Sequence, residues 1–294
     1  SFPTPKMPAT MPAPKQVVEL ATFLPRGVYT DGSVDYTARV QLALDNAANR
    51  TLVLPPFPVL VAPAAGRNWC LKVSDGTTIV GGPQAVLRTN TPAVQLLRIE
   101  NAQGVRLEGF GVEGVGGIGR ALGHGLVQLW RCKDVVLRDL RVFDADADGL
   151  AIAESENVRV TGCLVERASK AGIYLSNCTA AVVSGNVVRD TVGHVAPDGL
   201  LVGTGILLLS NADVTCNDNT IAVGVGPGIL CGSNEQQRAT DGVAIVGNRI
   251  RDCVNPTNGA TSSGIQLANV QFERRTHVLV ASNSIRTGEA TFFV

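Results

Sequence analysis

Five residues whose side chains can move protons or balance charge lie in the middle of the chain. They are His124, Asp148, Lys170, Tyr174 and His194. Histidine is the side chain best matched to proton transfer near neutral pH, and a lysine can neutralise a carboxylate. We predict that these five residues are catalytic, provided that the fold brings them together.

Four of these residues stand beside a short phrase that returns along the chain: a glycine, a large apolar residue, any residue, and a second large apolar residue. The phrase begins at Gly125, Gly149, Gly172, Gly205, Gly228 and Gly264, in steps of 24, 23, 33, 23 and 36 residues. A repeat of this length predicts a solenoid, in which each unit buries its apolar face against its neighbours. The two longer steps predict insertions, which in a solenoid emerge on one face.

A second repeated phrase, an alternating strand followed by a turn residue, accompanies the first. When these phrases are stacked, the same position is occupied by Asn186, Asn219, Asn248 and Asn283. Asparagine tolerates left-handed turns, and its amide can bond to the neighbouring rung. We therefore predict a structural asparagine ladder and do not count these residues among the site.

Composition supports strands over helices. Apolar residues make up 45% of the chain but aromatic residues only 4%, and there are 32 glycines, which suits short strands and tight turns. The formal net charge is zero without runs of like charge, which argues against a nucleic-acid partner. No stretch approaches the ~20 apolar residues of a membrane span. The seven cysteines form no Cys-x-x-Cys pair, and we expect packed free thiols.

The chain divides into two parts. We expect residues 1–26 to form a Pro-rich strap or linker, because five prolines occur before Val17. This segment lacks the apolar stretch of a signal peptide, although one could have been removed. We expect residues 27–294 to form one solenoid domain with a helix over about residues 35–48. Asp35 can cap the N-terminus of this helix, and one face of the helix carries an apolar stripe.

The segment that opens this domain runs Gly27-Val-Tyr-Thr-Asp31-Gly32-Ser-Val-Asp35-Tyr-Thr37, and Pro55-Pro56 follows the helix. It resembles the opening of pectate-lyase-like superfamily proteins, in which such a segment, an amphipathic helix and a strand begin a right-handed parallel β-helix. The family's usual Pro-Pro-Gly-x-Tyr is here Pro-Pro-Phe-Pro-Val. The resemblance implies an all-β fold: a single-stranded right-handed parallel β-helix with an N-terminal capping α-helix.

Connections of variable length precede the glycine phrases, and the face that they form is our predicted binding face. It collects His124, Asp148, Lys170 and His194 together with Arg120, Asp146 and Asp198, which we assign to substrate binding, and Tyr174 lies beside it. The middle residue of each phrase should point outward, which gives the column Val127, Ala151, Tyr174, Leu207, Leu230 and Gln266. Gln266 completes the substrate-binding set.

Relatives in this superfamily mostly act on or bind polysaccharides, and the resemblance therefore implies a polysaccharide or oligosaccharide partner. Three chemistries fit the residues. A lyase or C5-epimerase of uronate glycans would use Lys170 and Arg120 to neutralise the carboxylate and His124, Tyr174 and His194 to exchange protons. A glycoside hydrolase would pair carboxylates such as Asp148. Asp148-Gly149-Leu150 resembles polygalacturonases, but their next Asp-Asp pair is here Lys170-Ala171.

The third chemistry is calcium binding by the alternate carboxylates Asp144, Asp146 and Asp148; otherwise no cofactor is expected. A non-catalytic alternative is a glycan-binding or adhesion module of a phage tail or cell-surface protein, which the apolar outward residues Val127 and Leu207 favour. The resemblance also implies an extracellular, secreted or virion-associated location and a homo-oligomer, a trimer if the protein comes from a phage.

Overall fold

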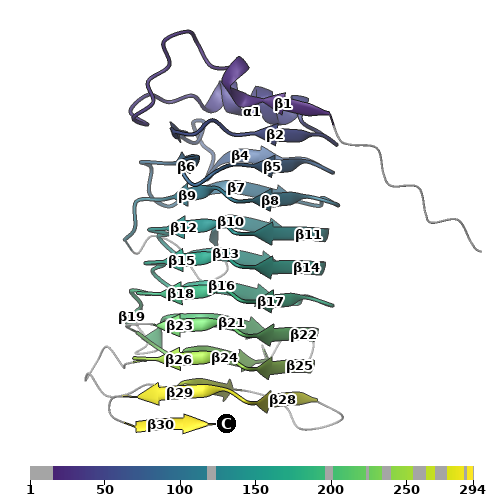
Figure 1. Cartoon of the computed structure of the whole chain (residues 1–294), viewed down its shortest axis with the longest axis vertical. Helices are drawn as coiled ribbons and strands as arrows, with labels where there is room; N and C mark the ends of the chain where they lie inside the picture. Colours follow the sequence, from purple (N-terminus) through teal and green to yellow (C-terminus); the bar gives the residue numbers. More distant parts are fainter. Residues whose placement is uncertain are drawn as a thin grey trace, which may run out of the picture.

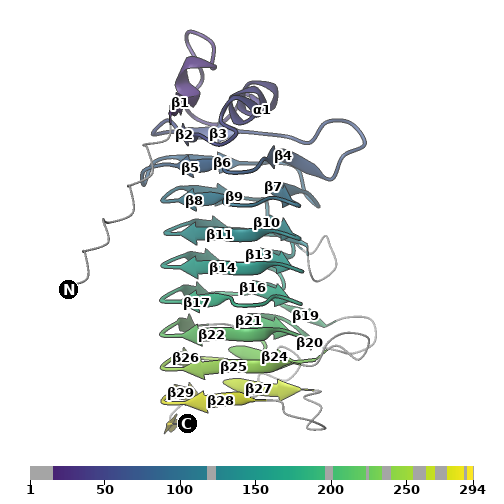
Figure 2. The same cartoon turned by 90° about the vertical axis from the view of Figure 1, so that its right-hand side faces the viewer.

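The computed structural model describes the larger part of the chain. The described residues are 16–117, 124–195, 201–222, 225–233, 240–253, 263–268, 277–287 and 290–293. They form a tall stack of rungs in which three parallel sheets surround one core (Figures 1 and 2). The predicted all-β parallel β-helix is therefore confirmed, and each rung runs through the three sheets in the same order.

The first strand of a rung lies in the eight-stranded sheet I. Its strands are β4 (Trp69–Val73), β7 (Gln95–Glu100), β10 (Gly125–Trp130), β13 (Asp148–Ala153), β16 (Ala171–Ser176), β21 (Thr204–Leu209), β24 (Ile229–Gly232) and β27 (Ile265–Ala268). The repeated glycine phrase thus corresponds to the later strands of this sheet.

The second strand of a rung lies in the ten-stranded sheet II. Its strands are β1 (Val17–Glu19), β2 (Thr51–Val53), β5 (Thr78–Val80), β8 (Arg106–Glu108), β11 (Lys133–Arg138), β14 (Glu156–Thr161), β17 (Val182–Ser184), β22 (Ala212–Asn217), β25 (Asp241–Val246) and β28 (Val278–Ala281). These strands carry the second repeated phrase.

The third strand lies in the ten-stranded sheet III. Its strands are β3 (Pro58–Leu60), β6 (Val86–Arg88), β9 (Gly111–Glu113), β12 (Arg141–Phe143), β15 (Leu164–Glu166), β18 (Val187–Arg189), β23 (Thr220–Ala222), β26 (Arg249–Arg251), β29 (Ser284–Thr287) and β30 (Ala290–Phe293). The last strand, β30, pairs antiparallel with β29.

The glycine of the repeated phrase lies where sheet I begins, close to sheet III. A Cβ built at Gly172 would overlap a Cγ methyl of Val188 and would lie 2.8 Å from the carbonyl oxygen of Gly205 in the next rung. At Gly149 the same Cβ would lie 2.5 Å from Cγ1 of Val165. The glycine is therefore required by close packing at this corner, since a methyl group has no room there.

The predicted asparagine ladder is confirmed. Asn186, Asn219, Asn248 and Asn283 are fully buried at the corner between sheets II and III. The Nδ2 of each of the first three donates to Oδ1 of the next asparagine at 2.9 Å. The same oxygen also accepts the backbone N–H of the asparagine before it, at 2.9 to 3.0 Å. The amides thus satisfy backbone groups that the turns would otherwise leave unpaired.

The N-terminal end of the stack carries the helix α1 (Thr37–Asn46), within the predicted range of 35–48 (Figure 1). Its buried residues Val40, Ala43 and Leu44 belong to the core cluster. Oδ1 of Asp35 accepts the N–H of Thr37 at 2.8 Å. The idea that this helix covers the end of the solenoid stays a prediction.

The solenoid also begins earlier than residue 27. Strand β1 pairs in parallel with β2, and Leu20, in the 3₁₀ turn η1 (Leu20–Thr22), is fully buried in the core cluster. This part of the proposed strap is therefore an edge strand of sheet II and part of the fold. Residues 1–15 lie outside the described residues.

All seven cysteines are buried and free, as expected. Burial raises the pKa of the thiols of Cys163, Cys216, Cys231 and Cys253 to about 12, so they stay protonated in the folded protein. They act as small apolar residues of the core. Within the described residues, no helix combines the length and the apolar character needed to span a membrane.

Candidate functional site

Three of the predicted catalytic residues do lie on successive rungs. The backbone N–H of Asp148 donates to the carbonyl oxygen of His124 at 3.2 Å, and that of Lys170 donates to the carbonyl oxygen of Ala147 at 3.0 Å. All three stand at the corner where a connection from sheet III enters sheet I. The backbone column thus contains His124, Ala147 and Lys170, and Asp148 lies one position further along its strand, opposite Gly125, so the predicted column is only partly present.

The side chains of Asp148 and Lys170 do not form an open catalytic face. Asp148 is fully buried, and its Oδ1 accepts the N–H of Ala171 at 3.0 Å. Lys170 is 7% exposed. The expectation that Asp148 and Lys170 lie on an open face is therefore wrong for this structure, while their catalytic roles stay predictions. Ser169 Oγ, next to Lys170 in the chain, donates to the carbonyl oxygen of Gly117.

Tyr174 occupies the outward face of sheet I, where it pairs with Ala151 of β13 and Leu207 of β21. Its pKa is raised, first by burial and further by the negative charge of Asp148, while a hydrogen bond with Ser176 opposes the shift. The phenol therefore stays protonated well above neutral pH, and it can donate a proton but is a poor base.

His194 lies in the connection between β18 and β21. Its backbone belongs to a small antiparallel pair of strands, β19 (His194–Val195) and β20 (Leu201–Val202), in which His194 pairs with Val202 (Figure 2). Arg120 and Asp198, which we assigned to substrate binding, lie outside the described residues. Their assignments stay predictions.

The outward column of sheet I differs from the prediction at β10. Strand pairing places Arg98, Gln128, Ala151, Tyr174, Leu207, Leu230 and Gln266 opposite one another in order. Val127 is fully buried, and Gln128 takes its place in the column. Gln266 is exposed as expected, but five rungs separate it from Gln128, or about 24 Å at 4.8 Å per rung.

The three carboxylates of the predicted calcium site diverge. Asp144 binds Arg167 through both oxygens, at 2.7 and 2.9 Å. Asp146 is 4% exposed and accepts the N–H of Ala93 at 2.7 Å. Among the residues that the structure describes, no group of three His, Cys, Asp or Glu side chains is placed to hold a metal ion. The ligand set Asp144, Asp146 and Asp148 therefore stays a prediction, and in this structure each of the three carboxylates accepts a hydrogen bond from another part of the chain.

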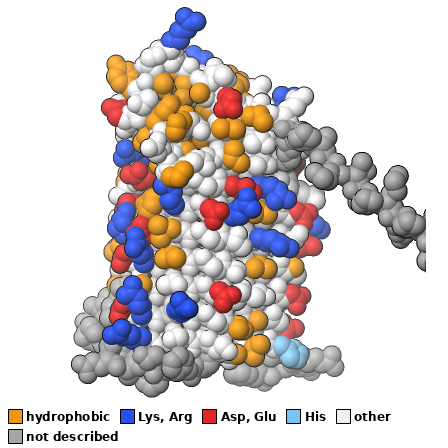
Figure 3. Space-filling model, viewed as in Figure 1, with side chains coloured by type: hydrophobic (Ala, Val, Ile, Leu, Met, Phe, Trp, Pro, Cys, Tyr) orange, Lys and Arg blue, Asp and Glu red, His pale blue; other side chains and the backbone are white. Residues whose placement is uncertain are grey.

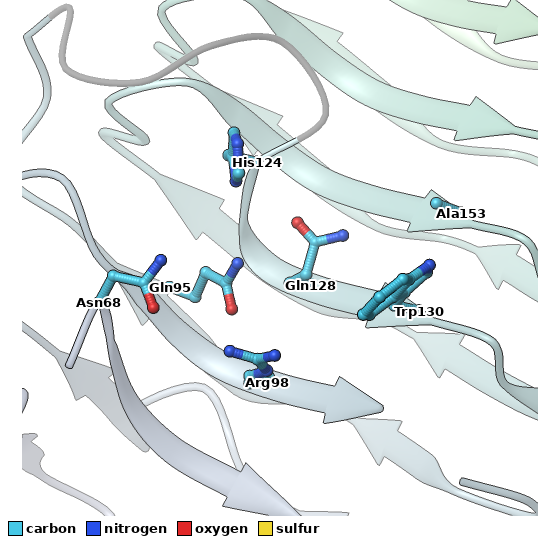
Figure 4. A pocket seen from close by; sticks show the side chains of 7 residues that line it. All are labelled: Asn68, Gln95, Arg98, His124, Gln128, Trp130 and Ala153. Atoms are coloured by element: carbon cyan, nitrogen blue, oxygen red, sulfur yellow. The ribbon is translucent and has the colours of Figure 1, made fainter. Parts of the chain in front are cut away.

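A pocket of about 320 Å³ opens on the outward face of sheet I, one rung before Asp148 (Figure 4). It is lined by Asn68, Gln95, Arg98, His124, Gln128, Trp130 and Ala153. These side chains come from three neighbouring strands and their flanking residues, and Figure 4 shows His124, Gln128, Gln95 and Arg98 around one space. Of the predicted catalytic residues, His124 belongs to this pocket.

Two buried amides form the polar floor of this pocket. Gln128 is held in place, since its Oε1 accepts the N–H of Gly125 at 2.9 Å and its Nε2 donates to the carbonyl oxygen of Leu129 at 3.3 Å. Gln95 is 6% exposed, and its Oε1 has no hydrogen-bond partner. A buried acceptor without a partner costs about 1–3 kcal/mol. The oxygen is enclosed, so a ligand that supplies an O–H or N–H donor would recover that energy once the Gln95 side chain turns toward the pocket.

The charges of the pocket are balanced. Nη2 of Arg98 lies 2.9 Å from Oε2 of Glu100, and its Nε donates to the same oxygen at 3.0 Å. Trp130 supplies an aromatic wall. The guanidinium of Arg131 stacks 4.3 Å from the centre of its ring and is itself bound to Glu154 at 2.8 Å. The described residues of the pocket therefore present amides, an aromatic surface and an arginine that is already paired.

Sequence reasoning missed Asn68, Gln95, Arg98, Gln128 and Trp130. The register shows why: Cys70 of β4 and Leu96 of β7 stand where later rungs carry the glycine of the phrase, so a search for that glycine misses these two strands. On β10 the phrase was found, but the strand is shifted by one position, so Gln128 was not expected to point outward. Extending the outward column toward the N-terminus by alternation alone would have reached Arg98.

The fold and the rung geometry define a right-handed parallel β-helix. The family model described as "Right handed beta helix region" matches residues 124–291. The chain therefore belongs to this family, and its resemblance to the pectate-lyase-like superfamily is confirmed. A search of curated protein sequences found no match.

Several solved structures share the fold. The pre-mature gene product 12 of bacteriophage phi29 is 15% identical with a TM-score of 0.63, over 92% of this chain and 42% of that one. A Family 28 exopolygalacturonase of Yersinia enterocolitica is 15% identical with a TM-score of 0.59, over 95% and 67%. The tailspike protein of E. coli bacteriophage HK620, in complex with a hexasaccharide, is 16% identical with a TM-score of 0.58, over 93% and 51%. The chain thus spans about half or less of the two phage proteins.

Proposed function

We propose that the protein binds a glycan along the outward face of sheet I and holds one sugar unit in the pocket around Gln95 and Trp130. The observation that carries the proposal is the combination of an unpartnered buried acceptor, a second fixed amide and an aromatic wall in one pocket. Sugars offer hydroxyl donors and flat apolar faces, which match these groups. The tailspike and exopolygalacturonase with the same fold support a carbohydrate partner.

The proposal extends to the charge of the sugar. Because Arg98 is already paired with Glu100, a uronate carboxylate would find no unpaired arginine or lysine among the described residues that line the pocket. An uncharged sugar unit fits the pocket better. The same lining contains no carboxylate, so paired-acid hydrolysis has no support at this position.

Replacing Gln95 by methionine tests the proposal, because this change keeps the shape and removes the acceptor. We expect affinity for the best ligand of a glycan panel to fall roughly tenfold, since a hydrogen bond in a buried pocket is lost. Trp130→Ala should weaken binding at least as much. The measurement is isothermal titration calorimetry against neutral oligosaccharides, alginate, pectate and glycosaminoglycans. Gln103→Met is the matched control, because Gln103 is exposed and outside the pocket.

Undiminished affinity in both Gln95→Met and Trp130→Ala would show that glycan binding occurs elsewhere. Tighter binding of alginate or pectate than of every neutral oligosaccharide would contradict the proposal that the bound sugar is uncharged, but not the proposal that the pocket binds a glycan.

A second candidate is the predicted lyase or C5-epimerase activity on uronate glycans. The observation in its favour is the place of Tyr174 on the outward face of sheet I, in the same column as Gln128 of the pocket that contains His124. In this reaction a base removes the proton at C5, and an acid serves the leaving oxygen or the opposite face of the sugar. The phenol of Tyr174, which is protonated at neutral pH, would serve as the acid, and the imidazole of His124 would serve as the base.

If the protein has this activity, Tyr174→Phe should lower turnover roughly 100-fold, within the usual range for a general acid. The measurement is the ultraviolet absorbance of unsaturated uronates, with proton NMR of the polymer to detect epimerisation. Polymers that stay unchanged with the wild-type protein, while binding remains measurable, would remove the enzyme hypothesis and leave a glycan-binding module.

We also propose an oligomeric state and a location for the protein. A trimer at a virion or other extracellular surface agrees with the phage proteins that share the fold, and light scattering of the purified protein would measure its mass in solution.

A further inference from the structure

One column of outward side chains on sheet III is charged at most of its rungs. Strand pairing places these residues opposite one another in order: Arg88, Glu113, Phe143, Glu166, Arg189, Ala222, Arg251 and Arg286. In the upper part, arginines pair with acids. Nη2 of Arg88 lies 3.3 Å from Oε1 of Glu113, and Nε of Arg189 lies 2.5 Å from Oε1 of Glu166. Opposite charges across a ladder stabilise the sheet.

The last two rungs break this pattern, because Arg251 pairs directly with Arg286. Like charges in this position destabilise a sheet. Arg251 has a partial partner, since its Nη1 lies 3.0 Å from Oδ2 of Asp252, but both side chains are more than half exposed and such a pair contributes little. Within the part of the chain that the structure describes, Arg249 and Arg286 have no acidic partner.

These three arginines share a cavity of about 270 Å³ with Thr220, Ile250 and Ser284. Arg249 stands between Thr220 and Ser284 in the neighbouring column, so two hydroxyl groups flank it. Figure 3 shows basic side chains gathered at the lower left of the molecule, over the C-terminal part of sheet III. The cavity thus combines excess positive charge with neutral hydrogen-bond donors.

We propose that this cavity binds a phosphate or sulfate group. Guanidinium groups bind the oxygens of such anions through paired N–H donors, and serine and threonine hydroxyls can supply further donors. A dianion between Arg251 and Arg286 would replace their repulsion by attraction. The site lies on sheet III, away from the pocket of sheet I, and does not depend on the proposed glycan-binding function.

The test measures anion binding by the whole protein and by Arg286→Gln. Titration calorimetry with sodium sulfate and with sodium phosphate, against sodium chloride at equal ionic strength, should show saturable binding to the wild-type protein. Arg286→Gln should weaken that binding roughly tenfold or more, because it removes charge-assisted hydrogen bonds. A parallel titration with a sulfated disaccharide distinguishes a free anion from one carried by a glycan. If the disaccharide binds more tightly than sulfate, the natural ligand is a group carried by a glycan. If the two bind equally, the free ion suffices.

Arg88→Gln is the matched control, because Arg88 stands in the same column but pairs with Glu113. It should retain the sulfate affinity of the wild-type protein. Without sulfate, the melting temperature of Arg286→Gln should equal or exceed that of the wild-type protein, since a repulsion is removed. Unchanged sulfate affinity in Arg286→Gln would overturn the proposal. Self-association at low salt that Arg286→Gln abolishes would also overturn it, in favour of an acidic surface of a second copy.

Discussion

Asn219→Ala should destabilise the folded protein by several kcal/mol. The side chain of Asn219 is fully buried and takes part in bonds on both sides. Its Nδ2 donates to the carbonyl oxygen of Val183 at 3.0 Å and to Oδ1 of Asn248 at 2.9 Å, and its Oδ1 accepts both the backbone N–H and Nδ2 of Asn186. Alanine would leave these groups buried without partners, at about 1–3 kcal/mol for each group that water cannot reach.

The measurement is urea unfolding followed by circular dichroism. Asn217→Ala is the matched control: it removes a nearby asparagine, at the end of β22, whose amide donates to exposed Asp218 at 2.7 Å. We expect this control to stay within about 0.5 kcal/mol of the wild-type protein, as is usual for surface substitutions. Equal urea midpoints for the two variants would contradict a stabilising role of the ladder.

Gly172→Ala should destabilise the protein by about 3 kcal/mol, at the upper end of the usual cost of overpacking. The added methyl group would meet a Cγ methyl of Val188 and the carbonyl oxygen of Gly205. Val188 is fully buried in the core, and the Gly205 carbonyl belongs to the backbone of the next rung. Neither can give way without moving a strand, and the strain therefore remains in the folded state.

Gly82→Ala provides the control for this change. A Cβ at Gly82 would have open space, and the residue is exposed. Thermal and urea midpoints of this variant should match those of the wild-type protein. A Gly172→Ala protein that is as stable as Gly82→Ala would show that the corner between sheets III and I can relax.

The fold could be predicted because each rung repeats the same structural requirements. A glycine is needed at the crowded corner before sheet I, and an asparagine fits the corner before sheet III, so both leave a periodic signal in the sequence. The register of β10 could not be predicted in this way. Its Gly125 pairs with Asp148 instead of Gly149, and every later residue of that strand therefore moves by one position. This shift buries Val127 and turns Gln128 outward.

The site was harder to predict than the fold. His124 was found because histidines are rare in this chain, but Asp148 and Lys170 were assigned to an open face. Residues in the connections follow no alternation, so the sequence does not reveal whether a carboxylate points to solvent or, like that of Asp148, bonds to the backbone of the next rung. The amides of the pocket carry no charge, and a search for catalytic groups therefore does not select them.

The asparagine ladder has a consequence for how the sequence of such a chain can vary. Consecutive ladder residues lie 33, 29 and 35 positions apart in the sequence, yet their amide contacts all measure 2.9 Å. The distance along the chain is thus decoupled from the distance between rungs. The segments that join sheet III to sheet I, and those that join sheet I to sheet II, differ in length from rung to rung while the stack keeps its geometry. The stack is in this sense a rigid scaffold whose loops can be exchanged, and we expect that new specificities can be introduced at these two corners without refolding the rest.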